Sequence, residues 1–273
     1  MPARLEIPQP ACALRGERHE RPVKILPVPA LLVHGNPDSH LLWERVKEHL
    51  DGSPGDVHAV DLPGFAEPVP DGFATTKEAY VEWIIDKLES LAASSGPVDL
   101  VGHDWGSLLV QRIASIRPDL LSSVAAGGAT VDVEYPWHSI AQVWQTPGEG
   151  ERYMEEELTP EVSVPYLVEN GMPREYAERN SWLVPGNKDC ILALYRSAVK
   201  VGEEWQPGLE QIELPSMVIW GRHDPYVELP WGERLAARMH AELVVLDCGH
   251  WWPFEQPRET ADALQRLWTN ARR

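Results

Sequence analysis

The chain has 273 residues, of which 43% are hydrophobic and 24% are charged. This length suits one large domain, or a core with one sizeable insertion, and the composition is that of a globular protein. Its 42 acidic and 24 basic residues give a formal net charge of −18. Because an acidic protein repels phosphate groups, the charge argues against a nucleic-acid partner and against an anionic membrane surface.

The sequence also lacks the marks of a membrane or secreted protein. No stretch approaches the ~20 apolar residues of a membrane helix, and residues 1–16 carry Pro and Glu where a signal peptide has its apolar core. The three cysteines, Cys12, Cys190 and Cys248, are an odd number and lie far apart, so we predict free thiols. We therefore expect a cytoplasmic protein with no membrane partner.

Short apolar runs alternate with amphipathic segments along most of the chain. The runs have the length of buried strands and cover residues 30–35, 57–64, 98–103, 122–129, 216–221 and 242–249. Apolar residues at helical spacing predict helices at Thr76–Ala92, Ser107–Ser115, Pro230–His240 and Arg258–Asn270. Strands separated by helices predict an α/β fold with a mostly parallel, doubly wound sheet.

Residues 132–211 break this alternation. Their composition shifts to Trp, Tyr, Glu and Pro at helical spacing, without a convincing strand pattern. We interpret them as a helical cap domain inserted between two strands of a core domain made of residues 1–131 and 212–273. Because open α/β sheets bind ligands at the carboxyl ends of their strands, a cap over that edge would close a pocket.

Reactive residues follow the predicted strands. Residues 102–106, Gly-His-Asp-Trp-Gly, have the Gly-x-Nuc-x-Gly form of a nucleophile elbow, with Asp104 at the centre. An aspartate before a helix is also a common N-cap, which is the structural alternative for Asp104. Asp224 and His250 follow later strands, so the three residues occur in the order nucleophile, acid, histidine of an α/β-hydrolase.

The first predicted strand ends in His-Gly-Asn-Pro at residues 34–37. The backbone N–H of Asn36, together with that of Trp105, is predicted to form an oxyanion hole, and a purely structural turn is the alternative. The sequence has no metal-ligand spacing and no Gly-rich phosphate loop, so we expect neither a metal nor a cofactor.

Three segments together resemble the motifs of α/β-hydrolases with an aspartate nucleophile: His-Gly-Asn-Pro at 34–37, Gly-His-Asp-Trp-Gly at 102–106 and Asp-Cys-Gly-His-Trp at 247–251. That group comprises the epoxide hydrolases and the haloalkane dehalogenases, and the resemblance covers nearly the whole chain beyond about residue 20. It implies the α/β-hydrolase fold with a helical cap inserted between strands, in agreement with the pattern of strands and helices.

An aspartate nucleophile decides the class of substrate. A carboxylate is ionised at pH 7 and displaces a leaving group at a saturated carbon, which forms an alkyl ester on Asp104. His250, oriented by Asp224, would then activate a water molecule that hydrolyses this ester. Because carboxylate attack on an ester or amide gives a mixed anhydride, esterase, lipase and protease activities are disfavoured.

The leaving group separates two activities. An epoxide opens to a basic alkoxide that needs an O–H donor, and Leu-Tyr-Arg-Ser at 194–197 resembles the segment in which epoxide hydrolases carry a ring-opening tyrosine, here Tyr195. The family's second tyrosine matches Ile140, so the usual pair is incomplete. Other aromatic residues are expected as pocket wall or as substitute donors, namely Trp144, Trp251, Tyr135 and Tyr153.

Asn36 and Trp105 also resemble the Asn and Trp pair that binds halide in haloalkane dehalogenases. Many of those enzymes carry their acid after the earlier strand, here near residues 127–130. Two carboxylates close to that place are the reserve candidates, Asp132 and Glu134.

The position of Asp224 and the presence of Tyr195 favour an epoxide over a halide. We therefore predict a hydrolase that opens a small apolar epoxide to a vicinal diol, with dehalogenation of a haloalkane as the alternative. A non-catalytic binding protein on the same fold is a third hypothesis. The intact set of Asp104, Asp224 and His250 argues against it.

Overall fold

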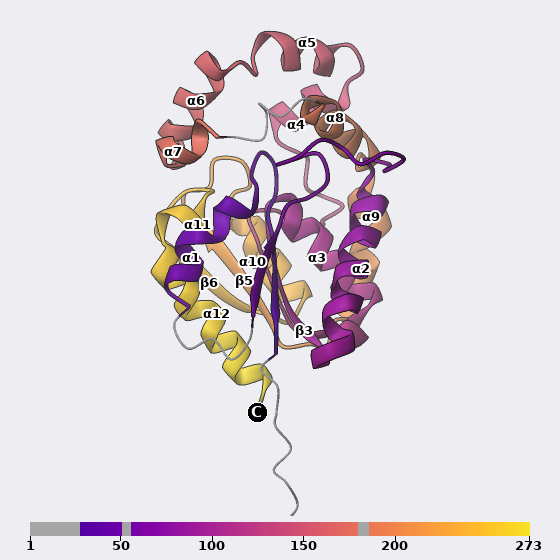
Figure 1. The fold of residues 1–273 in the computed structure, drawn as a ribbon, viewed down its shortest axis with the longest axis vertical. Helices are drawn as coiled ribbons and strands as arrows, with labels where there is room; N and C mark the ends of the chain where they lie inside the picture. The colour runs from indigo at the N-terminus through magenta and orange to yellow at the C-terminus, as the bar shows by residue number, and fades with distance from the viewer. Residues whose placement is uncertain (1–27, 51–55, 180–185) are drawn as a thin grey trace, which may run out of the picture.

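A computed structural model describes residues 28–50, 56–179 and 186–273 (Figure 1). The six strands of this part of the chain form one sheet in the order β2-β1-β3-β4-β5-β6, and every neighbouring pair is parallel. The strands are β1 (Ala30–Val33), β2 (Val57–Val60), β3 (Val98–His103), β4 (Leu121–Gly127), β5 (Ser216–Gly221) and β6 (Glu242–Leu246). The predicted parallel, doubly wound sheet is confirmed. Its topological switch point lies between β1 and β3, from which the strand order runs in opposite directions.

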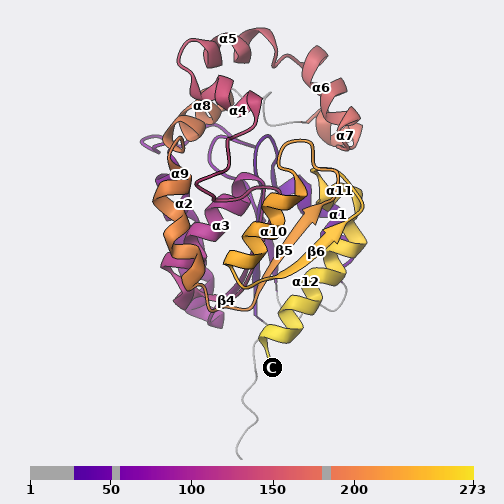
Figure 2. The same ribbon diagram turned by 180° about the vertical axis from the view of Figure 1, so that it is seen from behind.

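A run of helices separates β4 from β5 in the sequence. They are α4 (Ser139–Gln145), α5 (Glu149–Glu156), α6 (Pro160–Glu169), α7 (Arg174–Ala177), α8 (Asn187–Ser197), α9 (Val201–Trp205) and the 3-10 helix η4 (Gln206–Gln211). Helices α4 to α8 form a layer beyond one end of the sheet, opposite the end near which the chain terminates (Figures 1 and 2). Helix α9 instead lies beside α2, and η4 packs against α3. Residues 132–179 and 186–211 contain no strand.

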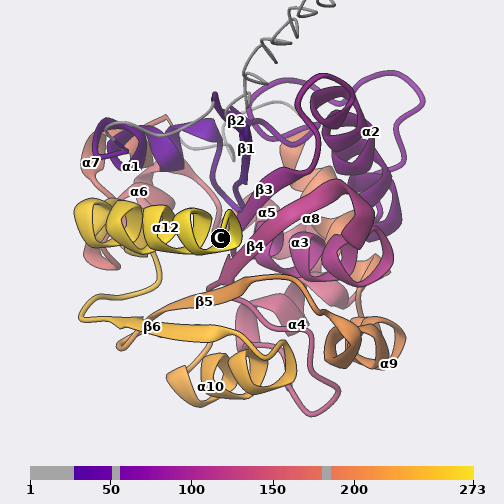
Figure 3. The same cartoon turned by 90° about the horizontal axis from the view of Figure 1, so that it is seen from below.

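Helices cover both faces of the sheet. Helices α1 (Glu44–Glu48) and α12 (Pro257–Ala271) lie on one face, while α2 (Lys77–Ser95) and α3 (Trp105–Ile116) lie on the other (Figure 3). Helix α10 (Leu229–Arg238) packs against β5 and β6. Three short elements complete the described core: η1 (His40–Trp43), η2 (Pro118–Leu120) and α11 (Trp252–Glu255). Every residue of β3 and β5 is buried, which explains why these strands form continuous, mainly apolar runs in the sequence.

The predicted elements agree with the observed ones to within a few residues. Helix α2 starts where predicted because Thr76 is its N-cap, whose hydroxyl accepts a hydrogen bond from the Ala79 N–H at 3.4 Å. Four of the strands stop two to four residues before their apolar runs do. The remaining residues of each run turn away from the sheet, and these turns build the loops at the carboxyl ends of the strands.

The structure also bears on the predictions about membrane-spanning segments and about the cysteines. No helix within the described ranges is both long enough and apolar enough to span a lipid bilayer. Cys190 and Cys248 are buried free thiols. Cys12 and the segment 1–16, on which the signal-peptide argument rests, lie outside the described residues.

Candidate active site

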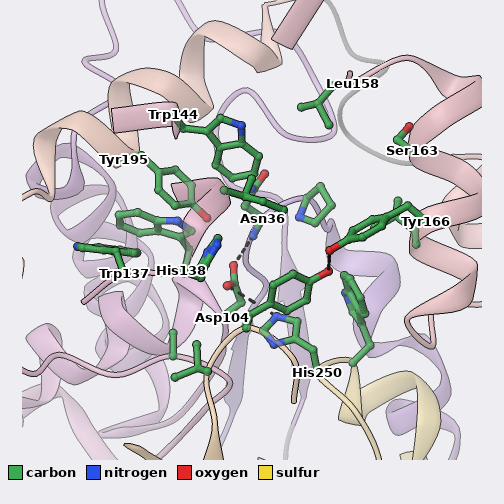
Figure 4. Close-up of a pocket in the computed structure, with 18 of the residues that line it drawn as sticks. Asn36, Asp104, Trp137, His138, Trp144, Leu158, Ser163, Tyr166, Tyr195 and His250 are labelled. Atoms are coloured by element: carbon green, nitrogen blue, oxygen red, sulfur yellow. Dashed lines mark hydrogen bonds and ion pairs between the residues drawn. The ribbon is translucent and has the colours of Figure 1, made fainter. Parts of the chain in front are cut away.

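A cavity of about 130 Å³ lies between the carboxyl ends of the strands and helices α4, α6 and α8 (Figure 4). At roughly 10–15 Å³ for each water-sized site, it has room for about ten water molecules, which is the scale of a small organic molecule. Its walls are mostly aromatic and aliphatic, and the described residues that line it include no Lys or Arg. Most predicted site residues line it: Asn36, Asp104, Trp105, Ile140, Trp144, Tyr195, His250 and Trp251.

Asp104 occupies a sharp turn between β3 and α3. Its backbone has φ 52° and ψ −121°, a strained conformation for a residue with a side chain. The turn needs two glycines, because a Cβ on Gly102 would lie 2.3 Å from the Gly106 carbonyl oxygen, and one on Gly106 would lie 2.3 Å from the Val33 carbonyl oxygen. The Asp104 side chain makes no capping hydrogen bond to α3, so the N-cap alternative does not explain this aspartate.

Two backbone N–H groups hold the Asp104 carboxylate. The Asn36 N–H donates to Asp104 Oδ1 at 2.7 Å, and the Trp105 N–H also interacts with the carboxylate. Burial raises the pKa of the Asp104 carboxyl to about 6, although these hydrogen bonds and the charge of His250 oppose the shift. The carboxylate is therefore ionised at neutral pH, and the two N–H groups converge at the place predicted for an oxyanion hole.

His250 faces Asp104 from the loop after β6 and is held by Asp224 from the loop after β5. His250 Nδ1 donates to Asp224 Oδ2 at 2.7 Å, and its Nε2 lies 3.7 Å from Asp104 Oδ2. The other Asp224 oxygen accepts hydrogen bonds from the N–H groups of Tyr226 and Val227 at 2.8 and 3.0 Å. The acid and the imidazole are thus fixed, with Nε2 aimed at the space beside Asp104.

The charge state of His250 depends on its two carboxylate neighbours. Burial alone would lower the pKa of His250, but the charge and hydrogen bond of Asp224 and the charge of Asp104 raise it to about 9. The imidazole is therefore protonated at neutral pH as long as Asp104 is ionised. Removing the charge on Asp104 would make this proton easier to lose.

The reserve carboxylates do not reach this site. Asp132 Oδ2 pairs with the Arg234 Nε at 3.0 Å and with the Arg238 Nη2 at 3.2 Å. Glu134 is exposed and pairs with Arg234 as well. Neither carboxylate contacts His250, so Asp224 is the residue that orients the imidazole.

Tyr195 projects from α8 with its hydroxyl toward Asp104 (Figure 4). Its ring packs edge-on against Trp144 and Trp105, with centroids 4.8 and 5.1 Å apart. Burial, followed by the charge of Asp104, raises the pKa of the Tyr195 hydroxyl well above 10. The hydroxyl therefore keeps its proton and presents an O–H beside the carboxylate.

The other candidate donors differ in what they can reach. The Tyr135 hydroxyl donates to the Tyr226 carbonyl oxygen at 3.3 Å, so its proton is engaged. Tyr153 lines the cavity near Glu157, away from Asp104. The indole N–H of Trp105 is buried at the cavity and lies beside the Tyr195 hydroxyl, where it opposes part of the rise in the pKa of Tyr195.

Asp38 and His138 belong to the site region, but neither was predicted from the sequence. Asp38 follows the His-Gly-Asn-Pro motif directly, which is the only signal that points to it. His138 stands in the irregular segment between β4 and α4, where no periodicity marks one residue over another.

Asp38 is a buried carboxyl that carries a proton. His103 Nε2 lies 2.9 Å from the His250 carbonyl oxygen, which only accepts, so His103 carries its proton on Nε2. Burial lowers the pKa of His103 well below 6.5, so its Nδ1 is an unprotonated acceptor, and it faces Asp38 Oδ2 at 3.7 Å. Burial, and then the charge of Asp104, raise the pKa of Asp38 to about 8. A neutral Asp38 carboxyl avoids placing two acceptors opposite each other.

Replacing Asp38 with asparagine is expected to stabilise the protein at neutral pH. The carboxyl has a pKa of 3.8 when unperturbed and about 8 in the folded state. Between these values the folded state holds one proton more than the unfolded state, so this group lowers the free energy of unfolding as pH rises, by at most about 1.4 kcal/mol per pH unit. An asparagine accepts from the Trp251 indole as Asp38 does at 3.3 Å, donates toward His103, and has no charge to bury.

Urea unfolding of wild type and Asp38→Asn between pH 4 and pH 8 measures this difference. The two free energies of unfolding should nearly coincide at pH 4 and separate steadily up to pH 8, with the variant more stable. Asp71→Asn, on the exposed surface, is the matched control. A difference that stayed constant with pH would contradict a protonated Asp38.

Comparison with known proteins gives a family and a range of activities. Residues 30–263 match the sequence profile of the "Alpha/beta hydrolase family". An (E)-2-((N-methylformamido)methylene)succinate hydrolase from Acinetobacter baylyi is 24% identical over 245 residues, which are 87% of this chain and 89% of that protein. A haloalkane dehalogenase from Psychrobacter cryohalolentis is 33% identical over 101 residues, only 36% of this chain and 33% of that protein.

Solved structures support the same fold. A loop variant of a haloalkane dehalogenase from Bradyrhizobium elkanii superimposes with a TM-score of 0.73 at 17% identity, covering 90% of this chain and 92% of that one. At this identity the similarity establishes the α/β-hydrolase fold and leaves the activity to be argued from the site.

Proposed function

We propose that this chain, which belongs to the alpha/beta hydrolase family, hydrolyses a small, uncharged epoxide to a vicinal diol. Asp104 is the nucleophile in this proposal, and His250, held by Asp224, is the base. Residues 132–211 act as a cap that supplies the donor. The observation that carries the proposal is the buried, protonated Tyr195 hydroxyl directed toward Asp104 (Figure 4).

In the first step an Asp104 carboxylate oxygen attacks a ring carbon and the ring C–O bond breaks. The new C–O bond makes an alkyl ester, and the electron pair of the broken bond goes to the ring oxygen. Tyr195 donates its proton to that oxygen as the charge develops. This step needs no base, because the pKa of Asp104, about 6, leaves the carboxylate ionised at neutral pH.

In the second step a water molecule hydrolyses the ester. Ester formation removes the negative charge of Asp104, which is one cause of the raised pKa of His250. The imidazolium then gives its proton back to the Tyr195 phenolate, which restores the tyrosine hydroxyl and leaves the imidazole as a neutral base. It takes a proton from water as the water oxygen attacks the ester carbonyl carbon. The N–H groups of Asn36 and Trp105 stabilise the oxyanion until the acyl C–O bond breaks. The leaving alkoxide takes a proton from the His250 imidazolium and departs as the diol, and the new Asp104 carboxyl passes its own proton to His250, which restores the starting state.

The charge of the cavity supports an uncharged substrate. A carboxylate substrate, such as the succinate derivative named for the Acinetobacter baylyi relative, would need a cationic partner. The described lining residues contain no Lys or Arg, the positive charge of His250 is already paired with Asp104 and Asp224, and Asp104 is itself anionic. Neutral apolar molecules meet neither obstacle.

Haloalkane dehalogenation is the second candidate, favoured by one observation. The side chains of Trp105 and Asn36 both lie at the cavity beside the Tyr195 hydroxyl, and such N–H donors suit a halide leaving group. A halide is a weak base and needs no proton. The Tyr195 hydroxyl would then have no role in chemistry, which is why we place this function second.

Parallel turnover assays on aryl epoxides and bromoalkanes test the proposal, with diol and halide as the products measured. We expect diol from wild type, and we expect Tyr195→Phe to slow diol formation by about 10²-fold or more, because the alkoxide loses its proton donor. Tyr195→Phe should change halide release little. Tyr176→Phe is the matched control, since that hydroxyl contacts Glu44 outside the cavity. Halide without diol from wild type would overturn the epoxide assignment.

A further inference from the structure

His138 begins helix α4 as its N-cap residue. Its Nδ1 accepts a hydrogen bond from the Ala141 backbone N–H at 3.2 Å. An amide N–H only donates, so Nδ1 must carry a lone pair. A neutral imidazole has one proton, and the cap therefore fixes that proton on Nε2, the nitrogen on the far side of the ring.

The surroundings of His138 keep it neutral. Burial, followed by the positive charge of His250, lowers the pKa of His138 to about 4, and the charge of Asp224 opposes this only partly. The remaining neighbours of the ring are the aromatic rings of Trp144, Tyr195 and Tyr226. At neutral pH the side chain is therefore an uncharged N–H donor in a mostly aromatic wall.

This donor belongs to the cavity in which the leaving oxygen of an epoxide would form. His138 lines that cavity together with Asp104 and Tyr195, and its ring centroid lies 6.5 Å from that of Tyr195 (Figure 4). The position that matches the family's second tyrosine is Ile140, which has no polar group and lies in the first turn of the same helix. The neighbouring Tyr135 hydroxyl is engaged with the Tyr226 carbonyl oxygen.

We propose that His138 is a second hydrogen-bond donor to the leaving oxygen, with Nε2–H and the Tyr195 hydroxyl binding that oxygen together. The inference rests on the proposed epoxide hydrolysis. Tyr195 supplies the proton that the alkoxide takes up, while His138 keeps its own and only stabilises the charge. The hydrogen bond from the Ala141 N–H to Nδ1 keeps the proton of the imidazole on Nε2. Without it, an unprotonated Nε2 could face the negatively charged oxygen.

Two substitutions separate the donor from the cap. His138→Asn keeps an oxygen that caps Ala141, since Asn is a preferred N-cap, but it has no N–H at the Nε2 position. His138→Gln keeps an N–H near the Nε2 position but is a poor N-cap. We expect His138→Asn to slow ester formation from an aryl epoxide by about 10–10²-fold with an unchanged Tm, because one oxyanion donor is lost. His138→Gln should retain more of the rate and lose some thermal stability.

Ester formation is measured by mixing excess enzyme with the epoxide, quenching with acid and recording the intact mass of the protein over time. If His138 were only a cap, His138→Asn would react at the wild-type rate, and His138→Gln would be the slower variant. That result would overturn the inference and leave the epoxide reaction standing. If wild type formed neither an ester nor a diol from any epoxide, the proposed function would fail, and this inference with it.

Discussion

The His250→Gln variant is expected to react once with an epoxide and then stop, with the substrate bound to Asp104 as an ester. Attack by Asp104 uses the carboxylate itself and needs no base. Loss of the His250 charge raises the pKa of Asp104 further, so the reaction is followed at alkaline pH, where the carboxylate is ionised. Hydrolysis of the ester does require the imidazole, because water must lose a proton as it attacks. Loss of that base should lower the steady-state rate by about 10²–10⁴-fold while the first step continues.

Intact mass spectrometry distinguishes the two candidate reactions in this variant. An epoxide adds its whole mass, because ring opening expels no atom, whereas a bromoalkane adds its mass less that of HBr. Peptide mapping should place the added mass on Asp104. His223→Gln is the matched control, because His223 is exposed and its Nε2 pairs with Asp247 at 3.0 Å, away from the cavity. Normal turnover by His250→Gln would refute the ester mechanism.

Most of the fold follows from the sequence because the sheet is covered on both faces. Strands β3 and β5 are wholly buried, so they stand out as continuous apolar runs that need no alternation to be recognised. The residues brought together at the cavity were also predictable in outline. Asp104, Asp224 and His250 each follow a strand, and the carboxyl ends of parallel strands meet at one edge of the sheet.

The roles of some buried carboxylates could not be predicted from the sequence, because they depend on contacts between distant residues. The reserve role of Asp132 was open until the structure placed its carboxylate against Arg234 and Arg238. Protonation of Asp38 depends on its burial and on the charge of Asp104, which follows a different strand. No local pattern encodes such a neighbourhood.

The charge state and tautomer of His138 could not be predicted from the sequence either. Its neutrality comes from burial in the helical layer, and its tautomer comes from one hydrogen bond to Ala141. A sequence pattern can mark a residue as an N-cap, but the preferred caps are Ser, Thr, Asp and Asn, so a histidine does not stand out. Only the three-dimensional structure shows that this residue lines the cavity.

Asp104→Ala and Asp104→Gly are both expected to abolish turnover, with losses of about 10⁴-fold or more for any substrate. Glu157, the other carboxylate among the described lining residues, forms no ion pair with His250 and cannot replace Asp104. The stabilities of the two variants should differ in an unusual direction. At an ordinary position, glycine is less stable than alanine by about 0.4–1 kcal/mol, since it loses more backbone freedom on folding. At φ 52° and ψ −121°, any residue with a Cβ is strained by about 1–3 kcal/mol.

Glycine should therefore be at least as stable as alanine at position 104, which urea unfolding of the two variants at one pH would measure. Both variants lack the buried carboxyl, so the comparison isolates the backbone. If the glycine variant were less stable by the ordinary amount, the turn would not be strained. If the order is reversed, the same residue that is required for activity reduces stability. The reason would be that the tight turn aims the carboxylate at the N–H of Asn36 and the imidazole of His250, a direction that a relaxed backbone would not give it.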